Sequence, residues 1–219
     1  MDVARFLTIV SIAAIPVLFA ITLHEVAHGW VARWFGDRTA EMQGRLSLNP
    51  LRHIDPIGTV LVPAVLLLLG GFLFGWARPV PVDPRNLRHP RHHMAAVAAA
   101  GPAANFVMVI GWALVMVLAR SLNAGVLSHW LLLMGAYGIT INLVLALLNL
   151  LPIPPLDGGQ LVRNLLPPGP AATLLDRIQP FGFIIVLALI ATGLLVVLIG
   201  PPIQYLQGLL QSALGVRGL

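Results

Sequence analysis

Five stretches of this sequence are long and apolar enough to enter a lipid bilayer, whose hydrocarbon core takes about 20 helical residues to cross. They cover roughly 6–30, 57–77, 94–119, 130–151 and 181–199. The composition agrees, because 58% of the residues are hydrophobic and only 10% are charged, whereas a soluble domain carries about 25% charged residues. We therefore predict an all-α integral membrane protein. A soluble fold, a disordered chain and a nucleic-acid-binding module are excluded.

The charged and reactive residues further limit the topology and the kinds of site that the protein can have. The net charge of +5 comes entirely from arginine, since the chain has no lysine. In a membrane protein such an excess belongs to loops kept on the cytoplasmic side. There is no cysteine, which excludes disulfides, thiolate metal sites and cysteine nucleophiles.

The first apolar stretch ends in His24-Glu25-Val26-Ala27-His28. Residues four apart lie on the same face of a helix, so both imidazoles can reach one metal ion. Glu25 can approach a water on that ion without binding it, as in the helix of zinc proteases. A charged side chain in a spanning helix costs about 2.5–3.5 kcal/mol and usually marks function. We therefore interpret this sequence as a metal site and reject a chance occurrence.

A catalytic zinc ion takes three protein ligands and a water, so a third ligand must come from elsewhere. The position six residues after His28 is Trp34, and no glutamate follows Glu41. The open candidates are the other histidines and the aspartates Asp37, Asp55, Asp83, Asp157 and Asp176. Asp157 is favoured, because it follows the fourth apolar stretch in a Pro/Gly-rich segment. Non-helical backbone at membrane depth is tolerated only when it is buried in protein or lines a wet cavity.

Three motifs in this order resemble the site-2 protease family of intramembrane zinc metalloproteases. They are HExxH at 24–28, Gly-x-x-x-Asn at 101–105, and Asn-x-x-Pro with a following Asp-Gly at 149–158. The resemblance covers about residues 15–165 and corresponds to a compact form without a PDZ domain.

The resemblance implies one catalytic Zn²⁺, bound by His24, His28 and Asp157, with Glu25 as the general base. It also implies that Asn105 and Asn149 line the active site and hold the extended substrate backbone or the developing oxyanion. The expected activity is that of a metalloendopeptidase that cleaves transmembrane or membrane-proximal segments of single-span membrane proteins.

The proposed metal site limits how often the chain crosses the membrane between its ligands. His28 and Asp157 both lie at C-terminal ends of apolar stretches and must sit at similar depth, which three full crossings between them would prevent. The stretch 57–77 is interrupted by Pro63 and Gly70-Gly71, so we predict that it is a re-entrant or interfacial hairpin. The chain then has about four transmembrane helices, with its N-terminus outside.

The distribution of arginine agrees with this topology. One side receives Arg33, Arg38, Arg45, Arg52, Arg78, Arg85, Arg88, Arg91, Arg163 and Arg177, and the other receives Arg5, Arg120 and Arg217. Arginine-rich loops mark the cytoplasmic face. We therefore expect an active site that opens toward the cytoplasm, in the cytoplasmic membrane of a prokaryote.

The remaining segments carry weaker expectations. Residues 38–50 are predicted to form a short extended segment after the first helix, which would pair with an unwound substrate; a plain loop is the alternative. Residues 1–219 are expected to form one membrane-embedded domain, with a helix and an amphipathic tail over 181–219. After Gly200-Pro201-Pro202, the tail would place its apolar side chains on one side, namely Ile203, Leu206, Leu209 and Leu210.

The sequence is compared with two other functions of membrane proteins, a metal transporter or scaffold and a serine protease. A metal-binding membrane transporter or scaffold is the main alternative, but transit sites spread their ligands along a pathway without a base beside the ion. A serine intramembrane protease is excluded, because no serine lies in a Gly-x-Ser-Gly context. His89, His92 and His93 lie among arginines before a predicted span, where lipid headgroups explain them better than a second metal site.

Overall fold

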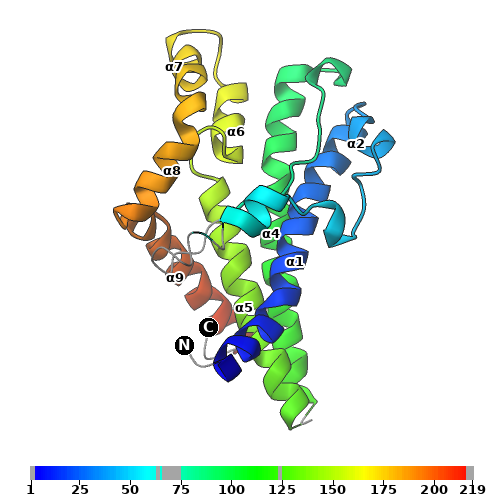
Figure 1. The fold of residues 1–219 in the computed structure, drawn as a ribbon, viewed down its shortest axis with the longest axis vertical. Helices are drawn as coiled ribbons and strands as arrows, with labels where there is room; N and C mark the ends of the chain where they lie inside the picture. Colours follow the sequence, from blue (N-terminus) through cyan, green and yellow to red (C-terminus); the bar gives the residue numbers. More distant parts are fainter. Residues whose placement is uncertain (1–2, 63–64, 66–74, 123–124, 216–219) are drawn as a thin grey trace.

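The computed structural model describes residues 3–62, 65, 75–122 and 125–215, and the regular elements within these residues are all helical. Three long helices form the centre: α1 (Val3–Trp34), α4 (Pro90–Ser121) and α5 (Val126–Asn149). The middle helix in the sequence order, α4, packs against both of the others. Their long, nearly continuous apolar sequences explain why they form, and the all-α membrane fold is confirmed (Figure 1).

Five helical stretches are long and apolar enough to cross a membrane, judged by length and composition. The first three are α1 from Thr8, α4 and α5, and they agree with the predicted stretches 6–30, 94–119 and 130–151. The other two are Pro170–Ala191 and Leu194–Leu214. The chain is therefore an integral membrane protein.

The interface between α4 and α5 contains the apolar core. Its buried side chains are Val109, Ala113, Met116, Ile139 and Leu143. Two glycines on α5 allow the close approach, since a Cβ at Gly135 would overlap Met116 and one at Gly138 would overlap Trp112. This packing fixes α4 relative to α5, on whose C-terminal side the Asp157 segment lies.

The stretch 57–77 begins and ends at the same place. It starts in η2 (Pro56–Leu61), and the predicted hairpin tip at 63–64 and 66–74 lies outside the described residues. The Trp76 amide donates to the Gly58 carbonyl at 3.0 Å, and the Thr59 hydroxyl donates to the Trp76 carbonyl at 2.8 Å. The two ends of the stretch are therefore held side by side, as the depth argument requires of them.

The extended segment predicted at 38–50 is wrong. Within it lie α2 (Thr39–Met42) and the start of the 3-10 turn η1 (Pro50–Arg52), with irregular backbone between them. Asp37 lies just before this helical turn, and its carboxylate accepts the backbone N–H and the hydroxyl of Thr39. Ion pairs from two arginines to Glu41 then brace that turn, so the local polar contacts favour a helix over a strand.

The C-terminal part differs from the predicted helix and tail. The stretch 181–199 is divided into α8 (Gly182–Ala191) and α9 (Leu194–Leu214) by Gly193, whose φ of 74° lies in the left-handed region. The helix α9 thus begins before the Gly-Pro-Pro sequence and continues through it. Its side chains Ile203 and Leu206 pack against the α4–α5 core, which accounts for a helix that tolerates two internal prolines.

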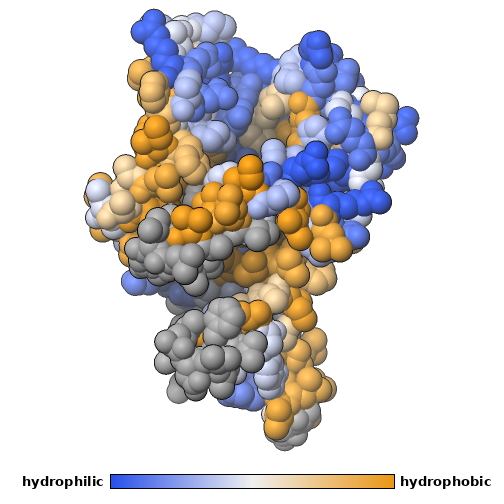
Figure 2. All heavy atoms as spheres, viewed as in Figure 1, coloured by the Kyte–Doolittle hydropathy of each residue, from blue (hydrophilic) through white to orange (hydrophobic). Residues whose placement is uncertain are grey.

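The helices α8 and α9 follow one another through the molecule. They run from the end that carries α6 (Asp157–Leu165) and α7 (Pro170–Ile178) to the end where both termini lie (Figure 1). By length and composition, α8 lies in one candidate membrane span and α9 forms another. Figure 2 shows hydrophilic residues gathered at the end with α2, α6 and α7, and hydrophobic residues over the middle and the opposite end.

Candidate metal centre

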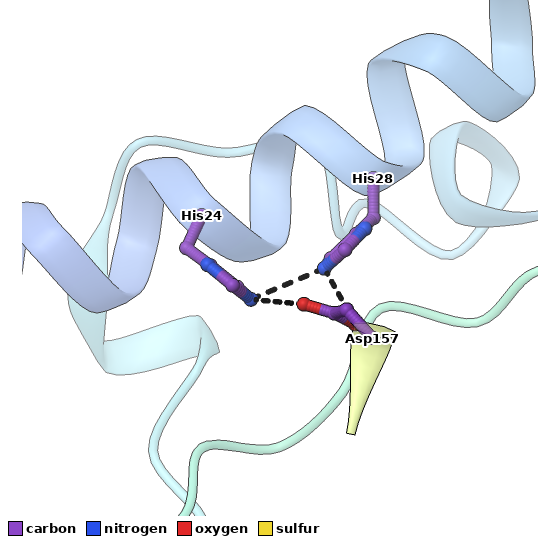
Figure 3. Close-up of side chains that lie close together, drawn as sticks. All are labelled: His24, His28 and Asp157. Carbon is purple, nitrogen blue, oxygen red and sulfur yellow. Dashed lines mark hydrogen bonds and ion pairs between the residues drawn. The ribbon is translucent and has the colours of Figure 1, made fainter. Parts of the chain in front are cut away.

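Three side chains from distant parts of the sequence meet near the polar end of the molecule. The His24 Nε2 atom lies 3.1 Å from Asp157 Oδ2, and the His28 Nε2 atom lies 3.5 Å from Asp157 Oδ1. The two Nε2 atoms are 3.2 Å apart. Figure 3 shows both imidazoles, on adjacent turns of α1, directed at the carboxylate on the first residue of α6. Among the described residues, this is the one group of three such side chains that could hold a metal ion.

The other candidate aspartates are engaged elsewhere. Asp37 accepts a hydrogen bond from Thr39, and Asp55 caps the start of η2. Asp83 forms an ion pair with Arg85, and Asp176 forms one with Arg163. Of the alternatives that the sequence left open, the structure therefore brings Asp157 to the histidine pair.

Local backbone packing places Asp157. The helix α5 ends at Asn149, and a proline-rich turn leads to α6. A Cβ at Gly158 would overlap the carbonyl of Leu150, and one at Gly159 would overlap the backbone of Pro154. The two glycines therefore let the start of α6 pack directly on the preceding turn, which holds the carboxylate in a fixed position.

The hydrogen bonds of the two imidazoles determine which nitrogen faces the centre. The His28 Nδ1 atom lies 2.7 Å from the Val97 carbonyl, which can only accept, so Nδ1 carries the proton. The His24 Nδ1 atom lies 2.6 Å from Asn105 Oδ1 and donates in the same way. In the neutral imidazole the other nitrogen is then an acceptor. Both Nε2 atoms therefore present lone pairs to each other and to Asp157.

This arrangement fits a cation. With both imidazoles neutral, two imidazole lone pairs and a carboxylate converge, and the buried Asp157 Oδ2 atom has no hydrogen-bond donor. Its close contact with His24 Nε2 supplies none in that form, because the neutral ring carries its proton on Nδ1. Buried acceptors grouped in this way are costly without a positive charge among them. Two imidazoles and one carboxylate are a ligand set of catalytic zinc, with a fourth position open for water or substrate.

Two residues of α4, Gly101 and Asn105, lie directly against the histidines. A Cβ at Gly101 would overlap both imidazole rings, so glycine is needed for α4 to approach α1 here. One turn later, Asn105 is fully buried and bonds His24. Its own amide nitrogen donates to Asn142 Oδ1 at 2.8 Å. The side chain thus contacts His24 on the side away from Asp157, and its contact with substrate stays a prediction.

Asn142 is a residue that sequence reasoning missed. It is fully buried on α5, and it joins Asn105 to the carbonyl of Gly138. The chain of contacts from His24 through Asn105 to Asn142 fixes the tautomer and the ring orientation, as outer partners of metal-binding histidines do. The available signal was a polar side chain inside an apolar stretch, which usually marks function in a membrane protein.

The two remaining predicted residues, Asn149 and Glu25, bond to backbone groups and not to the histidines. The Asn149 side chain donates to the Leu145 carbonyl of its own helix at 2.9 Å, so its contact with substrate stays a prediction. Glu25 accepts a hydrogen bond from the Val80 amide at its Oε2 atom, at 2.9 Å. The segment that contains Val80 was not assigned to the site from the sequence.

Comparisons with known proteins give a consistent picture. The sequence profile of Peptidase family M50 matches residues 119–193, which include Asp157. A Bacillus subtilis protein with the provisional name zinc metalloprotease YwhC is 39% identical over 191 residues, which are 86% of this chain and 84% of that protein. A Mycolicibacterium smegmatis protein with the provisional name zinc metalloprotease Rip2 is 35% identical over 80% of this chain and 64% of its own length.

A more distant relative is the regulator of sigma-E protease RseP of Escherichia coli. It is 36% identical over 114 residues, which are 50% of this chain and 24% of that protein. No solved structure matches this chain significantly.

Proposed function

This chain belongs to Peptidase family M50, the site-2 protease family of membrane zinc metalloproteases, and from that premise we propose that it hydrolyses peptide bonds within or beside the transmembrane segments of single-span membrane proteins. Its cofactor is Zn²⁺, as the names of its relatives indicate. The convergence of His24, His28 and Asp157 is the observation that carries the proposal. A transporter or inert scaffold is set aside, because the relatives are named as proteases.

The residues of the site have different roles in hydrolysis. His24, His28 and Asp157 would hold the zinc ion. When bound, the ion lowers the pKa of a coordinated water to about 7 and polarises the scissile carbonyl. Glu25 takes a proton from the attacking water and delivers it to the leaving amine as the C–N bond breaks. Asn105, itself held by Asn142, keeps the His24 ring oriented.

The substrate must reach this site in an extended form. The amides of a transmembrane helix are bonded within the helix, so a peptide bond becomes accessible only after the helix unwinds locally. Water is also required, and hydrocarbon supplies none. The position of the site near the hydrophilic end of the molecule supports access of water from that face (Figure 2).

Removal of zinc gives the direct test of this function. Purified protein in proteoliposomes is incubated with purified single-span membrane proteins, with and without a zinc chelator. We expect cleavage that stops on chelation and returns when zinc is added back, because without the ion neither the pKa of the water is lowered nor the scissile carbonyl polarised. Cleavage that persists after elemental analysis confirms zinc removal would contradict the proposal.

We further propose that the site opens toward the cytoplasm of a prokaryote. In Figure 1, the end of α1, the start of α4 and the helices α2, α6 and α7 lie at one end of the molecule, and both termini lie at the other. The arginines assigned to the cytoplasmic side lie in these elements or in the segments beside them. Arg120 lies at the end of α4, where its guanidinium donates to the Gly215 carbonyl.

Labelling of single cysteines tests this topology on a chain that has none of its own. Met42→Cys and Arg85→Cys lie on either side of the 57–77 stretch, and Val126→Cys lies at the start of α5; all three side chains are exposed. We expect a membrane-impermeant maleimide to label only Val126→Cys in intact cells, and all three variants after permeabilisation. Labelling of positions 42 and 85 from opposite faces would contradict the hairpin.

A further inference from the structure

A short segment that follows the 57–77 stretch contacts α1 beside the metal site. It comprises residues 78–83, Arg78-Pro79-Val80-Pro81-Val82-Asp83, and is called the strap below. A residue that precedes proline is confined to extended conformations, which explains why the strap forms no helix. The Val80 side chain packs against α1 so closely that a Cβ at Gly29 would overlap it. The Val80 amide donates to Glu25 Oε2, one turn earlier on α1.

One end of the strap is fixed by a buried arginine. Arg45 is only 8% exposed. Its Nη2 atom donates to the Arg78 carbonyl at 2.7 Å and to the Pro79 carbonyl at 3.3 Å. A buried guanidinium is costly unless its hydrogen bonds are used. Here the Nη2 atom holds the Arg78–Pro79 and Pro79–Val80 peptide units, and the second of these contains the Val80 amide.

The other end is fixed by a buried aspartate. The Asp83 amide donates to Asp37 Oδ2 at 2.7 Å, and Asp37 is 1% exposed. Burial raises the pKa of Asp37, but hydrogen bonds from Thr39, Asn86 and the Asp83 amide outweigh it and lower the pKa. The carboxylate is therefore held ionised as an acceptor, and the strap is attached at both ends to the loop that follows α1.

Within the described part of the chain, Glu25 accepts one hydrogen bond, and its donor is the Val80 amide. It occupies one carboxylate oxygen and leaves the other for a proton. A base on a side chain with several rotatable bonds gains from such a restraint, since a misplacement of about 1 Å can cost roughly 100-fold in rate.

We propose that the strap positions Glu25 for proton transfer, with the Val80 amide as the contact and Arg45 as the residue that holds the strap in place. Arg45 and Val80 are positioning residues, because they act through Glu25. The inference rests on the proposed function of Glu25 as general base. The opposite role, in which the strap covers Glu25 and inhibits the enzyme, predicts the opposite kinetic result.

Hydrogen exchange tests the contact without reference to activity. Prolines have no amide proton, so residues 79–84 contain only the amides of Val80, Val82 and Asp83. In zinc-loaded protein, we expect Glu25→Ala to speed the exchange of one of these amides at least about tenfold, since it removes the acceptor of Val80. Asp37→Ala is the matched control and is expected to release the Asp83 amide instead. Unchanged exchange in Glu25→Ala would overturn the proposal.

Kinetics test the role. Val80→Pro deletes the amide proton in a segment that is already extended, whereas Val80→Ala keeps it and removes only the side chain. We expect Val80→Pro to lower kcat roughly 10- to 100-fold with KM and zinc content unchanged, and Val80→Ala, which keeps the amide, to lose clearly less. Arg45→Met should lower kcat in the same way, and Arg45→Lys should restore part of it.

The outcomes separate this inference from the proposed function. If Val80→Pro is as active as Val80→Ala, the strap does not position Glu25, and if it is more active, the strap is an inhibitory cover. Either result overturns the inference alone, provided that Glu25→Gln is inactive. Full activity in Glu25→Gln protein would overturn the proposed role of Glu25 as well.

Discussion

Glu25→Gln protein is expected to bind zinc as the wild type does and to lose cleavage of membrane substrates. Glutamine has nearly the same size as glutamate, and its carbonyl oxygen can still accept the Val80 hydrogen bond. An amide cannot take up a proton from water, however, and general-base catalysis contributes typically about 10²–10⁴-fold in rate. We therefore expect a loss of at least about 100-fold, measured as cleavage rate per zinc-loaded molecule.

The chain supplies its own control for this variant. Glu41 is the one other glutamate in the sequence, and it pairs with Arg33 and Arg38 at the protein surface. Glu41→Gln should leave both zinc content and cleavage close to wild type. Cleavage at the wild-type rate by zinc-loaded Glu25→Gln protein would remove Glu25 from the chemistry.

Asp157→Ala protein is expected to lose zinc and activity together. The substitution removes the carboxylate that the two imidazoles face, and two histidines alone are an incomplete set for catalytic zinc. Loss of an outer partner of a metal ligand costs about 10–100-fold in affinity, so we expect loss of a direct ligand to cost more. Competition with a chelator of known affinity measures this effect.

Asp176→Ala is the matched control for the loss of an aspartate. Asp176 forms an exposed ion pair with Arg163, and such pairs contribute little. This variant should bind zinc with wild-type affinity. Wild-type zinc affinity in Asp157→Ala protein would show that the third ligand lies elsewhere.

The main features of the site follow from the sequence for simple physical reasons. The spacing of His24 and His28 specifies a shared helical face wherever the helix lies. The position of Asp157 after an apolar stretch, combined with the depth that a shared ion demands, requires the 57–77 stretch to return to its start. The hydrogen bonds between its two ends agree with that requirement.

Other features depend on tertiary contacts that a single sequence does not display. The Val80 amide is a backbone group 55 residues away from Glu25, and a backbone donor carries no side-chain signal. Asn142 lies within an apolar stretch, and its role depends on which α5 face meets Asn105. Two prolines within α9 oppose a helix by local propensity. The helix forms nevertheless, because its apolar side chains pack on the α4–α5 core.

The central claim is that two imidazoles and one distant carboxylate bind a single zinc ion. X-ray absorption spectroscopy at the zinc edge of purified protein tests it most directly. We expect four light-atom ligands at about 2.0–2.2 Å, with the multiple scattering of two imidazoles in the wild type and of one in His28→Ala protein. A zinc shell without histidine, or one that is unchanged by His28→Ala, would contradict the account.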